Sequence, residues 1–381
     1  MVKSLLTLAT ELKADGAFDR IMLNSLSQLG SVSMLNMGRE LMGARLLPDE
    51  MRRRNEYKEQ AVRYRTVVAT DGTPYTPAQL VKGAMVGSMK VELGHHDVKV
   101  EMDASQLEAL EEMILMKAET QGESAAELLA QQELLNWVDT SVNLSLQFKK
   151  ELQRWQAIVD AQVSRVFPGG TTETVSFPNP TGSRFNAGGT WSNDNYDPME
   201  DIIAACNRLW GLGFNIDKMV TSTNVVSIMA LNEKIRTRAG YLSTSGGAVL
   251  PVGIAGYGLP DVNSAIRRSG SGNNTLPDIM TYDLQYPTQT GTQYFLPRNC
   301  FVIIGSTGEN RQLLVDERIF PLYNTLGYYG VGRVEGYKKP GPIIHVDTYD
   351  KKPVSIVGEG YMTGFPVITN PEAICVIRNI S

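Results

Sequence analysis

The pattern of hydrophobic residues at the start of the chain predicts short helices that need a surface to lie on. Leu5, Leu8 and Leu12 recur at helical spacing, and a second apolar set follows between Phe18 and Leu29. Each set is shorter than the roughly 12 to 15 residues at which an isolated helix becomes stable in water. We therefore expect residues 1–56 to form an N-terminal arm that packs on its own core or on a neighbouring molecule.

Two stretches of alternating polarity predict a long hairpin over residues 57–99. Polar and apolar side chains alternate in residues 62–68 and again in residues 85–93, and the connection carries Asp71-Gly72 and two prolines. A two-stranded ribbon is at best marginally stable alone in water. The hairpin is therefore expected to pack against another molecule, with an ordinary sheet extension as the alternative.

A long helix is the most prominent element predicted in the first half. A third strand ends at Asp103, which forms a capping box with Gln106 at the start of a helix over residues 104–120. Residues 123–166 then contain no proline or glycine, and apolar residues step by three, four or seven. A continuous helix of that length would extend roughly 66 Å. The polar patch at residues 139–143 is where we expect a bend or an interruption.

The second half changes to shorter elements. Asp197-Pro198 predicts the start of a helix, and a strand at 219–222 precedes a helix at 225–238. Residues 239–277 are rich in glycine and serine and are interpreted as loops. The last hundred residues contain short β-branched runs separated by Gly, Pro or Asp. The sequence thus predicts an α+β protein.

Composition and charge narrow the class of protein. The 381 residues are 42% hydrophobic and 20% charged, which is typical of two or three globular domains and excludes disorder as the main state. The net charge of -5 gives no overall basic field for nucleic acid or an anionic membrane. No run approaches the roughly 20 apolar residues that span a bilayer. The three separated cysteines indicate free thiols in a reducing compartment.

Charge is unevenly spread along the chain. Ten acidic residues lie between Glu101 and Asp139 against Lys117 alone, whereas nine basic residues lie between Arg45 and Lys90 against five acidic ones. Complementary segments of this kind can fix the orientation of neighbouring copies. The alternative is two solvated faces of opposite sign. The residues predicted to contact a neighbouring subunit are Arg52, Arg53, Arg54, Lys58, Arg63, Arg65, Lys82, Lys90, Glu108, Glu111 and Glu112.

The sequence contains no pattern that predicts catalysis. Adjacent His95 and His96 would point to opposite faces of a strand and cannot easily share a metal. His345, near Asp347, is more simply a packing or surface residue. No phosphate-binding glycine loop and no activated serine can be recognised. We assign no catalytic, cofactor-binding or metal-binding residue, and we predict that the protein is not an enzyme.

Several segments resemble a known family in their shared order. The residues are WSNDNYDPMEDI (191–202), MVTSTNVVSIMALNEKIR (219–236), FLPRNCFVIIGS (295–306), GYYGVGR (327–333) and GFPVITNPEAICVIRN (364–379). Together with the arm, the hairpin and the long helix, they resemble the major capsid proteins of tailed phages, of the lambda type (the major capsid protein E family). The resemblance covers about residues 50–381.

The resemblance implies a Hong Kong 97-type capsid fold. Residues 57–99 would be its extended loop, residues 100–197 and 341–381 a peripheral domain with a spine helix at 123–166, and residues 198–340 an axial domain. Copies would form pentamers and hexamers that assemble an icosahedral shell around double-stranded DNA. Scaffolding, portal and decoration proteins are further partners that it implies. The expected location is the virion, after assembly in the host cytoplasm.

Two other functions stay open from sequence. An encapsulin-like nanocompartment would have the same fold and would enclose protein cargo instead of DNA. A soluble enzyme could hold a site in the Gly-rich region at 239–277. Some members of the wider fold join neighbouring copies by Lys-Asn bonds, but no partner for Lys82 or Lys90 can be identified.

Overall fold

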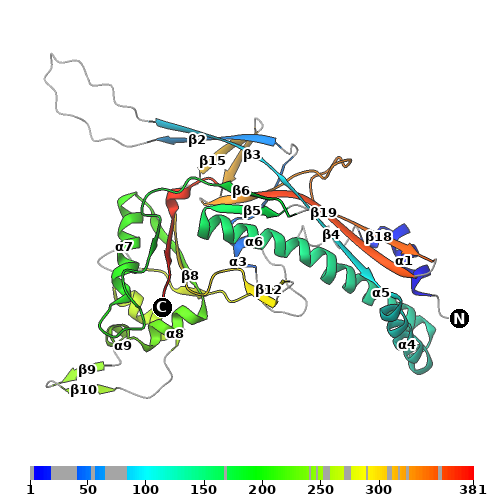
Figure 1. Cartoon of the computed structure of the whole chain (residues 1–381), viewed down its shortest axis with the longest axis horizontal. Helices are drawn as coiled ribbons and strands as arrows, with labels where there is room; N and C mark the ends of the chain where they lie inside the picture. The colour runs from blue at the N-terminus through cyan, green and yellow to red at the C-terminus, as the bar shows by residue number, and fades with distance from the viewer. Residues whose placement is uncertain are drawn as a thin grey trace, which may run out of the picture.

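The chain forms an elongated α+β molecule built on two five-stranded sheets (Figure 1). The computed structural model describes residues 4–18, 41–52, 56–64, 84–166, 170–239, 242–245, 248–251, 258–269, 276–288, 291–306, 311–315, 318–322, 326–350 and 354–381. For the strands within 56–64, 84–92, 242–251 and 311–322, the backbone alone is described. The predicted α+β class, with a long hairpin, a long helical segment and a strand-rich C-terminal part, is confirmed.

The first sheet is organised around its longest strand, β19 (Ser355–Ile368). β4 (Gly94–Met102) pairs antiparallel along one edge of β19. β18 (Ile343–Tyr349) and then β17 (Gly327–Val331) follow one another along the other edge, and the short β1 (Asp49–Met51) adds in parallel to β17. The sheet therefore joins segments from the beginning, middle and end of the chain.

Helices cover one face of this sheet. α4 (Ala104–Gln121) begins with the predicted capping box, in which Asp103 accepts the Gln106 N–H and the Gln106 side chain accepts the Asp103 N–H. α5 (Glu123–Val138) and α6 (Leu144–Asp160) are joined by a π-helical segment, Asp139–Asn143. The interruption predicted at the polar patch is thus a local π-helix.

The long helix ends earlier than the sequence predicted. Ala161 adopts a left-handed conformation with φ of 52°, and the chain then forms β5 (Gln162–Val166), which pairs with β6 (Thr172–Ser176). Val163, which is buried, suits a strand because β-branched side chains pack well on a pleated surface. The helix predicted over 123–166 therefore included a strand, because the apolar residues of α6 and of β5 follow each other without a proline or glycine between them.

The second sheet lies at the other end of the molecule, with helices on one side (Figure 1). Its strands are, in order, β11 (Ile279–Thr281), β8 (Asn215–Thr221), β14 (Phe301–Ser306), β20 (Ile374–Arg378) and β7 (Arg184–Asn186). The helices are α7 (Pro198–Gly211), α8 (Thr223–Leu231), α9 (Glu233–Ala239) and α10 (Leu259–Ser269). α7 begins at the predicted Asp197-Pro198, where Asp197 accepts the Met199 N–H.

Two predictions for this half were wrong. The helix predicted at 225–238 is two helices, because Asn232 turns its side chain to three backbone carbonyls and breaks the helix. The loops predicted over 239–277 contain α10, whose buried residues include Val262 and Ile266. Glycine and serine on either side of α10 obscured its short apolar stripe.

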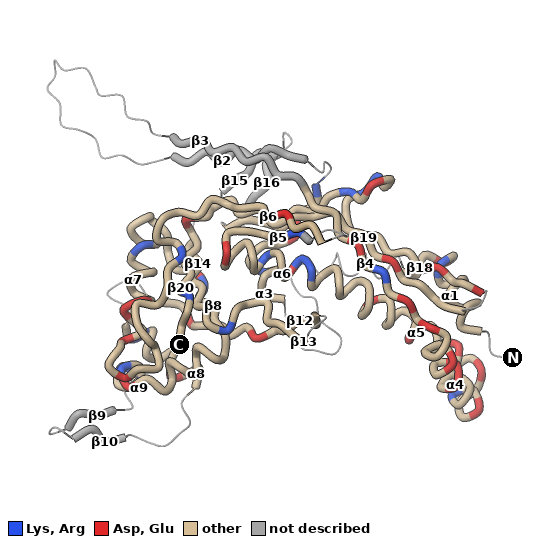
Figure 2. The backbone as a smooth tube through the Cα atoms, viewed as in Figure 1, with Lys and Arg blue, Asp and Glu red and all other residues tan. Residues whose placement is uncertain are grey.

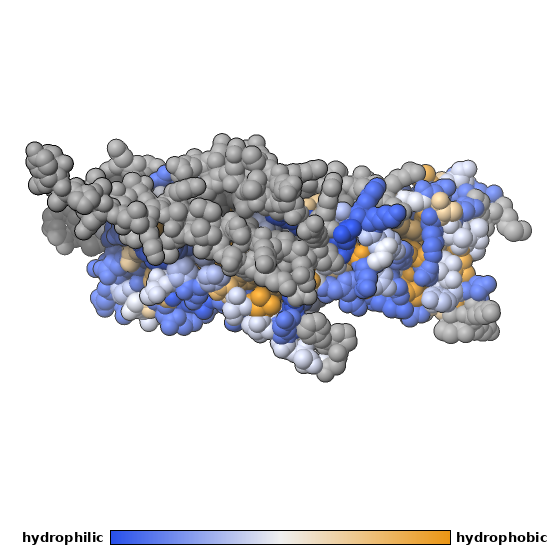
Figure 3. Space-filling model, turned by 90° about the horizontal axis from the view of Figure 1, so that it is seen from above, coloured by the Kyte–Doolittle hydropathy of each residue, from blue (hydrophilic) through white to orange (hydrophobic). Residues whose placement is uncertain are grey.

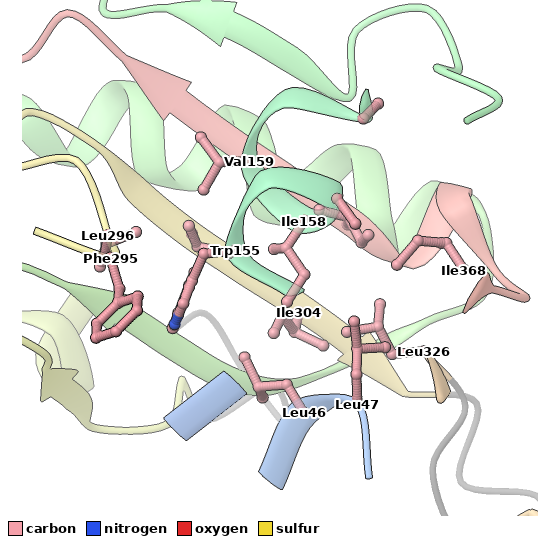
Figure 4. Close-up of a cluster of buried hydrophobic side chains, with 14 of the residues drawn as sticks. Leu46, Leu47, Trp155, Ile158, Val159, Phe295, Leu296, Ile304, Leu326 and Ile368 are labelled. Atoms are coloured by element: carbon pink, nitrogen blue, oxygen red, sulfur yellow. The ribbon is translucent and has the colours of Figure 1, made fainter. Parts of the chain in front are cut away.

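Three hydrophobic cores hold the molecule together. One lies between the second sheet and helices α7 to α10, and another joins the first sheet to α4, α5 and the N-terminal helix α1 (Leu5–Ala14). The third connects the two halves: Trp155, Ile158 and Val159 of α6 meet Ile304 of β14 and Ile368 of β19 (Figure 4). The end of α6 is therefore the junction between the two sheets.

Sheet membership does not follow the expected domain ranges everywhere. Residues 341–381 were expected in one domain; β18 and β19 lie in the first sheet, but β20 lies inside the second sheet, between β14 and β7. β17, expected in the axial domain, belongs to the first sheet. Long-range strand pairing decides these positions, and a local hydrophobic pattern carries no information about it.

The remaining elements are hairpins and short helices. β2 (Glu56–Tyr64) pairs antiparallel with β3 (Ala84–Glu92), as predicted, while the connection with Asp71-Gly72 lies outside the described residues. The short helices are α3 (Met42–Leu46) and a 3₁₀ turn at Pro371–Ala373. The other hairpins are β9 (Leu242–Ser245) with β10 (Ala248–Pro251), β12 (Gln285–Thr288) with β13 (Gly291–Tyr294), and β15 (Arg311–Val315) with β16 (Arg318–Leu322).

Candidate assembly elements

The hairpin β2–β3 stands apart from both five-stranded sheets. Among the described strands, β2 and β3 pair only with each other and join neither five-stranded sheet. Leu93 alone separates β3 from β4, so the second strand of the hairpin continues directly into the first sheet (Figure 1). The hairpin is therefore a two-stranded extension whose direction depends on how its two roots are held.

The root before β2 is fixed by buried charges. Asp49 of β1 accepts hydrogen bonds from Lys150 and Arg154 of α6, and the side chains of the two bases are 2% and 1% exposed. Burial acts to raise the pKa of Asp49, but the two neighbouring cations outweigh it and hold that pKa below its usual value. Burial lowers the pKa of Lys150, and Asp49 opposes that shift.

Arg52 completes this root inside its own chain. Its backbone N–H donates to the Val331 carbonyl, its Nη2 donates to Glu50 at 2.9 Å, and its guanidinium lies 4.5 Å from the centre of the Tyr328 ring. The side chain is 5% exposed. Within its own chain Arg52 therefore has an anchoring position, and its predicted contact with a neighbouring subunit stays a prediction.

Glu151 is a second buried connection at the same place. Its Oε1 accepts the Gly43 N–H at 2.7 Å, the Trp155 Nε1–H at 2.8 Å and the Tyr282 hydroxyl at 2.7 Å. These donors come from α3, α6 and the segment between β11 and β12. A Cβ on Gly43 would lie 2.7 Å from Glu151 Oε2, so only glycine allows this approach. The arm, the long helix and the second half of the chain are thus joined by one carboxylate.

These buried charges were missed by sequence reasoning, although a signal was present. Lys150 and Arg154 continue a buried stripe that steps by four residues, and the apolar Val142, Leu146 and Ile158 occupy its other positions in this stretch. A charged residue within an apolar helix stripe is either buried with an oppositely charged partner or shows that the stripe does not face the core. Lys150 and Arg154 are buried, with Asp49 as their shared partner.

The first helix of the N-terminal arm docks on the chain itself. Leu5, Leu8 and Leu12 of α1 are buried against α5 and β18. Lys13 donates to Asp347 Oδ1 at 2.5 Å at the exposed edge of this contact. The arm therefore finds part of its predicted surface in its own chain. The second apolar set of the arm lies mostly outside the described residues.

The predicted acidic contacts lie together on α4. Glu108, Glu111 and Glu112 are all exposed, and acidic residues continue along α4 and α5 (Figure 2). The basic candidates are placed less completely: Lys58, Arg63 and Lys90 lie on β2 and β3, where the backbone alone is described, and Arg53, Arg54, Arg65 and Lys82 lie outside the described residues. Their contact with a neighbouring subunit stays a prediction.

The WSNDNYDP segment serves the fold. Trp191 is fully buried and donates from Nε1 to Asp201 at 2.7 Å, and Asp201 also accepts the Gly188 N–H. The Asn232 side chain donates to the carbonyls of Trp191, Asn193 and Tyr196. This loop is held as a cap over α7, which agrees with the structural interpretation of the sequence.

The described residues offer little reactive chemistry. No group of three or more His, Cys, Asp or Glu side chains among them could hold a metal ion, and no described helix is long and apolar enough to cross a membrane. His95 is exposed and His96 is buried, so the two point to opposite faces of β4 as predicted. Burial, together with the nearby charge of Lys149, lowers the pKa of His96 to about 4.

The remaining histidine and the cysteines also have structural surroundings. His345 is hydrogen-bonded through Nε2 to the Tyr337 hydroxyl. The three free cysteines are buried, and burial raises the pKa of the Cys206 thiol to about 12 and of the Cys300 and Cys375 thiols to about 11. Thiols with such pKa values are poor nucleophiles near neutral pH.

Comparison with known proteins finds a likeness in structure alone. No family model and no curated protein matches the chain. Among the solved structures that resemble it is the putative capsid protein of a prophage of Escherichia coli CFT073, with 14% identity and a TM-score of 0.48 over 78% of this chain and 80% of that one. A phage-related protein from Bordetella bronchiseptica has 13% identity and a TM-score of 0.48 over 89% and 91% of the two chains.

A shell protein of another kind is also similar. The encapsulin of Synechococcus elongatus has 10% identity and a TM-score of 0.41, over 92% of this chain and 91% of that one. The chain is thus similar over most of its length to a phage capsid protein and to an encapsulin. At such identities the likeness concerns the arrangement of the backbone and leaves the residues of the site unmatched.

Proposed function

We propose that this chain is a structural shell protein, the major capsid protein of a tailed-phage head, that assembles with copies of itself. The observation that carries the proposal is the hairpin β2–β3, which pairs with no other described strand while its root is fixed by buried charges. A free two-stranded ribbon is marginally stable in water. Its stability in this proposal comes from a neighbouring copy.

The finer assembly follows from the same proposal. Copies form pentamers and hexamers that close into an icosahedral shell around double-stranded DNA, and the protein resides in the virion after assembly in the host cytoplasm. The net charge of -5 supports this, because a container should not bind its packed DNA tightly. Scaffolding, portal and decoration proteins are the further partners of such a shell.

Electron microscopy of the purified full-length protein tests the proposal. Closed particles or ring-shaped capsomers are the expected result. A uniform monomer at all concentrations would refute it. Apolar patches interrupt the hydrophilic surface in Figure 3, and they should be covered in such particles.

The contents of the particles separate a capsid from an encapsulin-like compartment. Particles from an infected or induced host should protect DNA of genome length from nuclease. Particles that contain a defined protein cargo and no such DNA would favour the compartment. Replacing His95, His96 and His345 together with Asp347 should leave particle formation possible, which addresses the alternative of an enzyme that depends on these groups.

A further inference from the structure

Helix α4 buries few of its residues for a helix of 18 residues. Only Leu107 and Ile114 of its 18 residues are buried, whereas ten of the 17 residues of α6 are buried. Met113, Leu115 and Met116 are 50%, 56% and 65% exposed. These three side chains lie on different sides of α4, so most of the helix surface is left without apolar packing within the described chain.

A groove runs between α4 and the N-terminal helix α1. It has a volume of about 640 Å³, and its floor is apolar, with Leu6, Leu107 and Val354. Two carboxylates, Glu108 and Glu111, stand at its rim. This volume lies within the range of pockets that bind ligands and is large enough to take apolar side chains of a partner.

A smaller and more polar groove lies on the other flank of α4. It has a volume of about 410 Å³ and lies between α4, β4 and α5. Leu110 and Trp137 line it, with the carboxylates of Glu101 and Glu133 beside them. Both flanks of α4 therefore combine an apolar floor with negative charge.

The charge of α4 decides which partner fits. The helix carries four glutamates and a single lysine, Lys117, so that two α4 helices from different copies would repel each other. A helix that carries lysine or arginine beside an apolar stripe could place its apolar side chains on the groove floor and pair its basic side chains with the carboxylates at the rim. Methionine side chains are flexible and adapt to such partners.

We propose that α4, with the groove along α1, is a docking surface for an amphipathic helix rich in lysine and arginine that belongs to a separate polypeptide. The partner's apolar side chains fill the floor at Leu6, Leu107 and Val354, and its basic side chains pair with Glu108 and Glu111. This assigns Glu108 and Glu111 to a separate polypeptide in place of the contact with a neighbouring copy predicted from the sequence, and it is testable whether or not the chain forms shells.

The test uses the purified full-length protein and three synthetic peptides as long as α4. One peptide has leucines at helical spacing with lysines elsewhere, the second has the same composition in scrambled order, and the third carries glutamates in place of the lysines. Affinity is measured by calorimetry, and hydrogen exchange locates the site. The first peptide should bind and should slow amide exchange in residues 5–8 and 104–111; the other two should bind at least about tenfold more weakly.

Substitutions separate the groove from general acidity. Glu108→Gln with Glu111→Gln should weaken binding of the first peptide by about tenfold, because two charge pairs are lost. Glu119→Gln with Glu123→Gln removes the same charge outside the groove lining and should change the affinity less than twofold. All four side chains are exposed, so folding is retained.

Three results would overturn the proposal. Equal binding of the scrambled peptide, or an equal loss in the control pair, would mean that α4 attracts positive charge without a defined site. Protection of α4 amides on raising the protein concentration alone would show that a second copy is the occupant. A failure of the protein to form shells would leave this result unaffected, so the two proposals fail separately.

Discussion

Replacing Gly360 by a larger residue should destabilise the fold, because a side chain there would collide with the π-helical segment Asp139–Asn143. A Cβ at Gly360 would lie 2.5 Å from Val142 Cγ1, 3.0 Å from Val98 Cγ1 and 3.1 Å from Leu146 Cδ1. Val142 is fully buried and, being β-branched, has little rotamer freedom. The neighbours cannot yield without moving β4 or α6 away from β19.

The magnitude follows from two opposing effects. Overpacking of a filled core lowers the free energy of unfolding by about 1–3 kcal/mol. Replacing glycine by alanine raises it by about 0.4–1 kcal/mol, because the unfolded chain loses conformational freedom. Gly360→Ala should therefore lower the free energy of unfolding by about 1–2 kcal/mol. Urea unfolding of the unassembled chain, followed by tryptophan fluorescence, measures the change as a lower midpoint with an unchanged slope.

Two further variants make the reasoning refutable. Gly211→Ala is the matched control, since a Cβ there meets nothing within 4 Å, and it should be neutral or slightly stabilising. Adding Val142→Ala to Gly360→Ala should cost less than the sum of the two single changes, by about 0.5–3 kcal/mol, because the smaller side chain leaves room for the new methyl group. A wild-type midpoint for Gly360→Ala, or strict additivity, would show that β19 and the π segment are not in such close contact.

Three other predictions concern titratable and charged groups. The pKa of His96 is lowered from 6.5 to about 4 in the fold, so the fold favours the neutral side chain. The stability that this gives above pH 6.5, about 3 kcal/mol, should be lost as the pH falls towards 4. Urea midpoints of His96→Leu, measured against pH, should lack this loss, and curves parallel to those of the wild type would contradict the prediction. Asp49→Asn leaves the buried cations Lys150 and Arg154 without their carboxylate and should lower the free energy of unfolding by about 3–5 kcal/mol. Lys13→Ala breaks an exposed ion pair and should lower it by less than about 1 kcal/mol. Similar urea midpoints for the two variants would argue against a buried cluster. Arg52→Ala should lower the thermal midpoint of the unassembled chain through the loss of a charged hydrogen bond of about 1.5–3 kcal/mol, and an unchanged midpoint would contradict the anchoring role of Arg52 within the chain.

Local signals in the sequence were sufficient to predict several elements. The capping box at Asp103 and the helix start at Asp197-Pro198 depend on residues within one turn of each other, and both are present in the structure. The two strands of the hairpin alternate in polarity and pair as predicted. Such features are determined within a few residues and need no knowledge of the rest of the chain.

The buried face of the long helix required more than a count of apolar spacings. Leu128 lies in the predicted range and is apolar, yet it is 58% exposed. One line of buried residues, beside others in α6 such as Trp155 and Val159, steps by four along the whole helical segment: Ala126, Ala130, Leu134, Val138, Val142, Leu146, Lys150, Arg154 and Ile158. In an α-helix such a stripe moves about 40° around the axis with each step. The wider turn of the π segment at 139–143 rotates it back, so that α5 and α6 both face the sheet.

The strand order of the two sheets could not be predicted in this way. β20 lies beside β14 in one sheet while β19, which immediately precedes the short turn before β20, forms the centre of the other. A chain that crosses between sheets at residues 369–373 gives no local sign of its destination, because apolar β-branched runs fit either sheet. Only the packing around Phe301, Ile303 and Cys375 selects the second sheet.

The fixed root of the hairpin has a physical consequence for the proposed assembly. Buried ion pairs such as Asp49 with Lys150 and Arg154 contribute little net stability compared with apolar residues, but they tolerate few alternative geometries. Arg52 adds a backbone bond to β17 directly after this cluster, so the chain leaves the first sheet in a set direction before β2 begins. A hairpin held in this way loses less conformational freedom when a neighbouring copy binds it, and the free energy of each contact is correspondingly more favourable. In the proposed assembly, the charges buried within the chain would therefore act on association by fixing direction, while the marginal two-stranded ribbon would supply the surface that a neighbour covers.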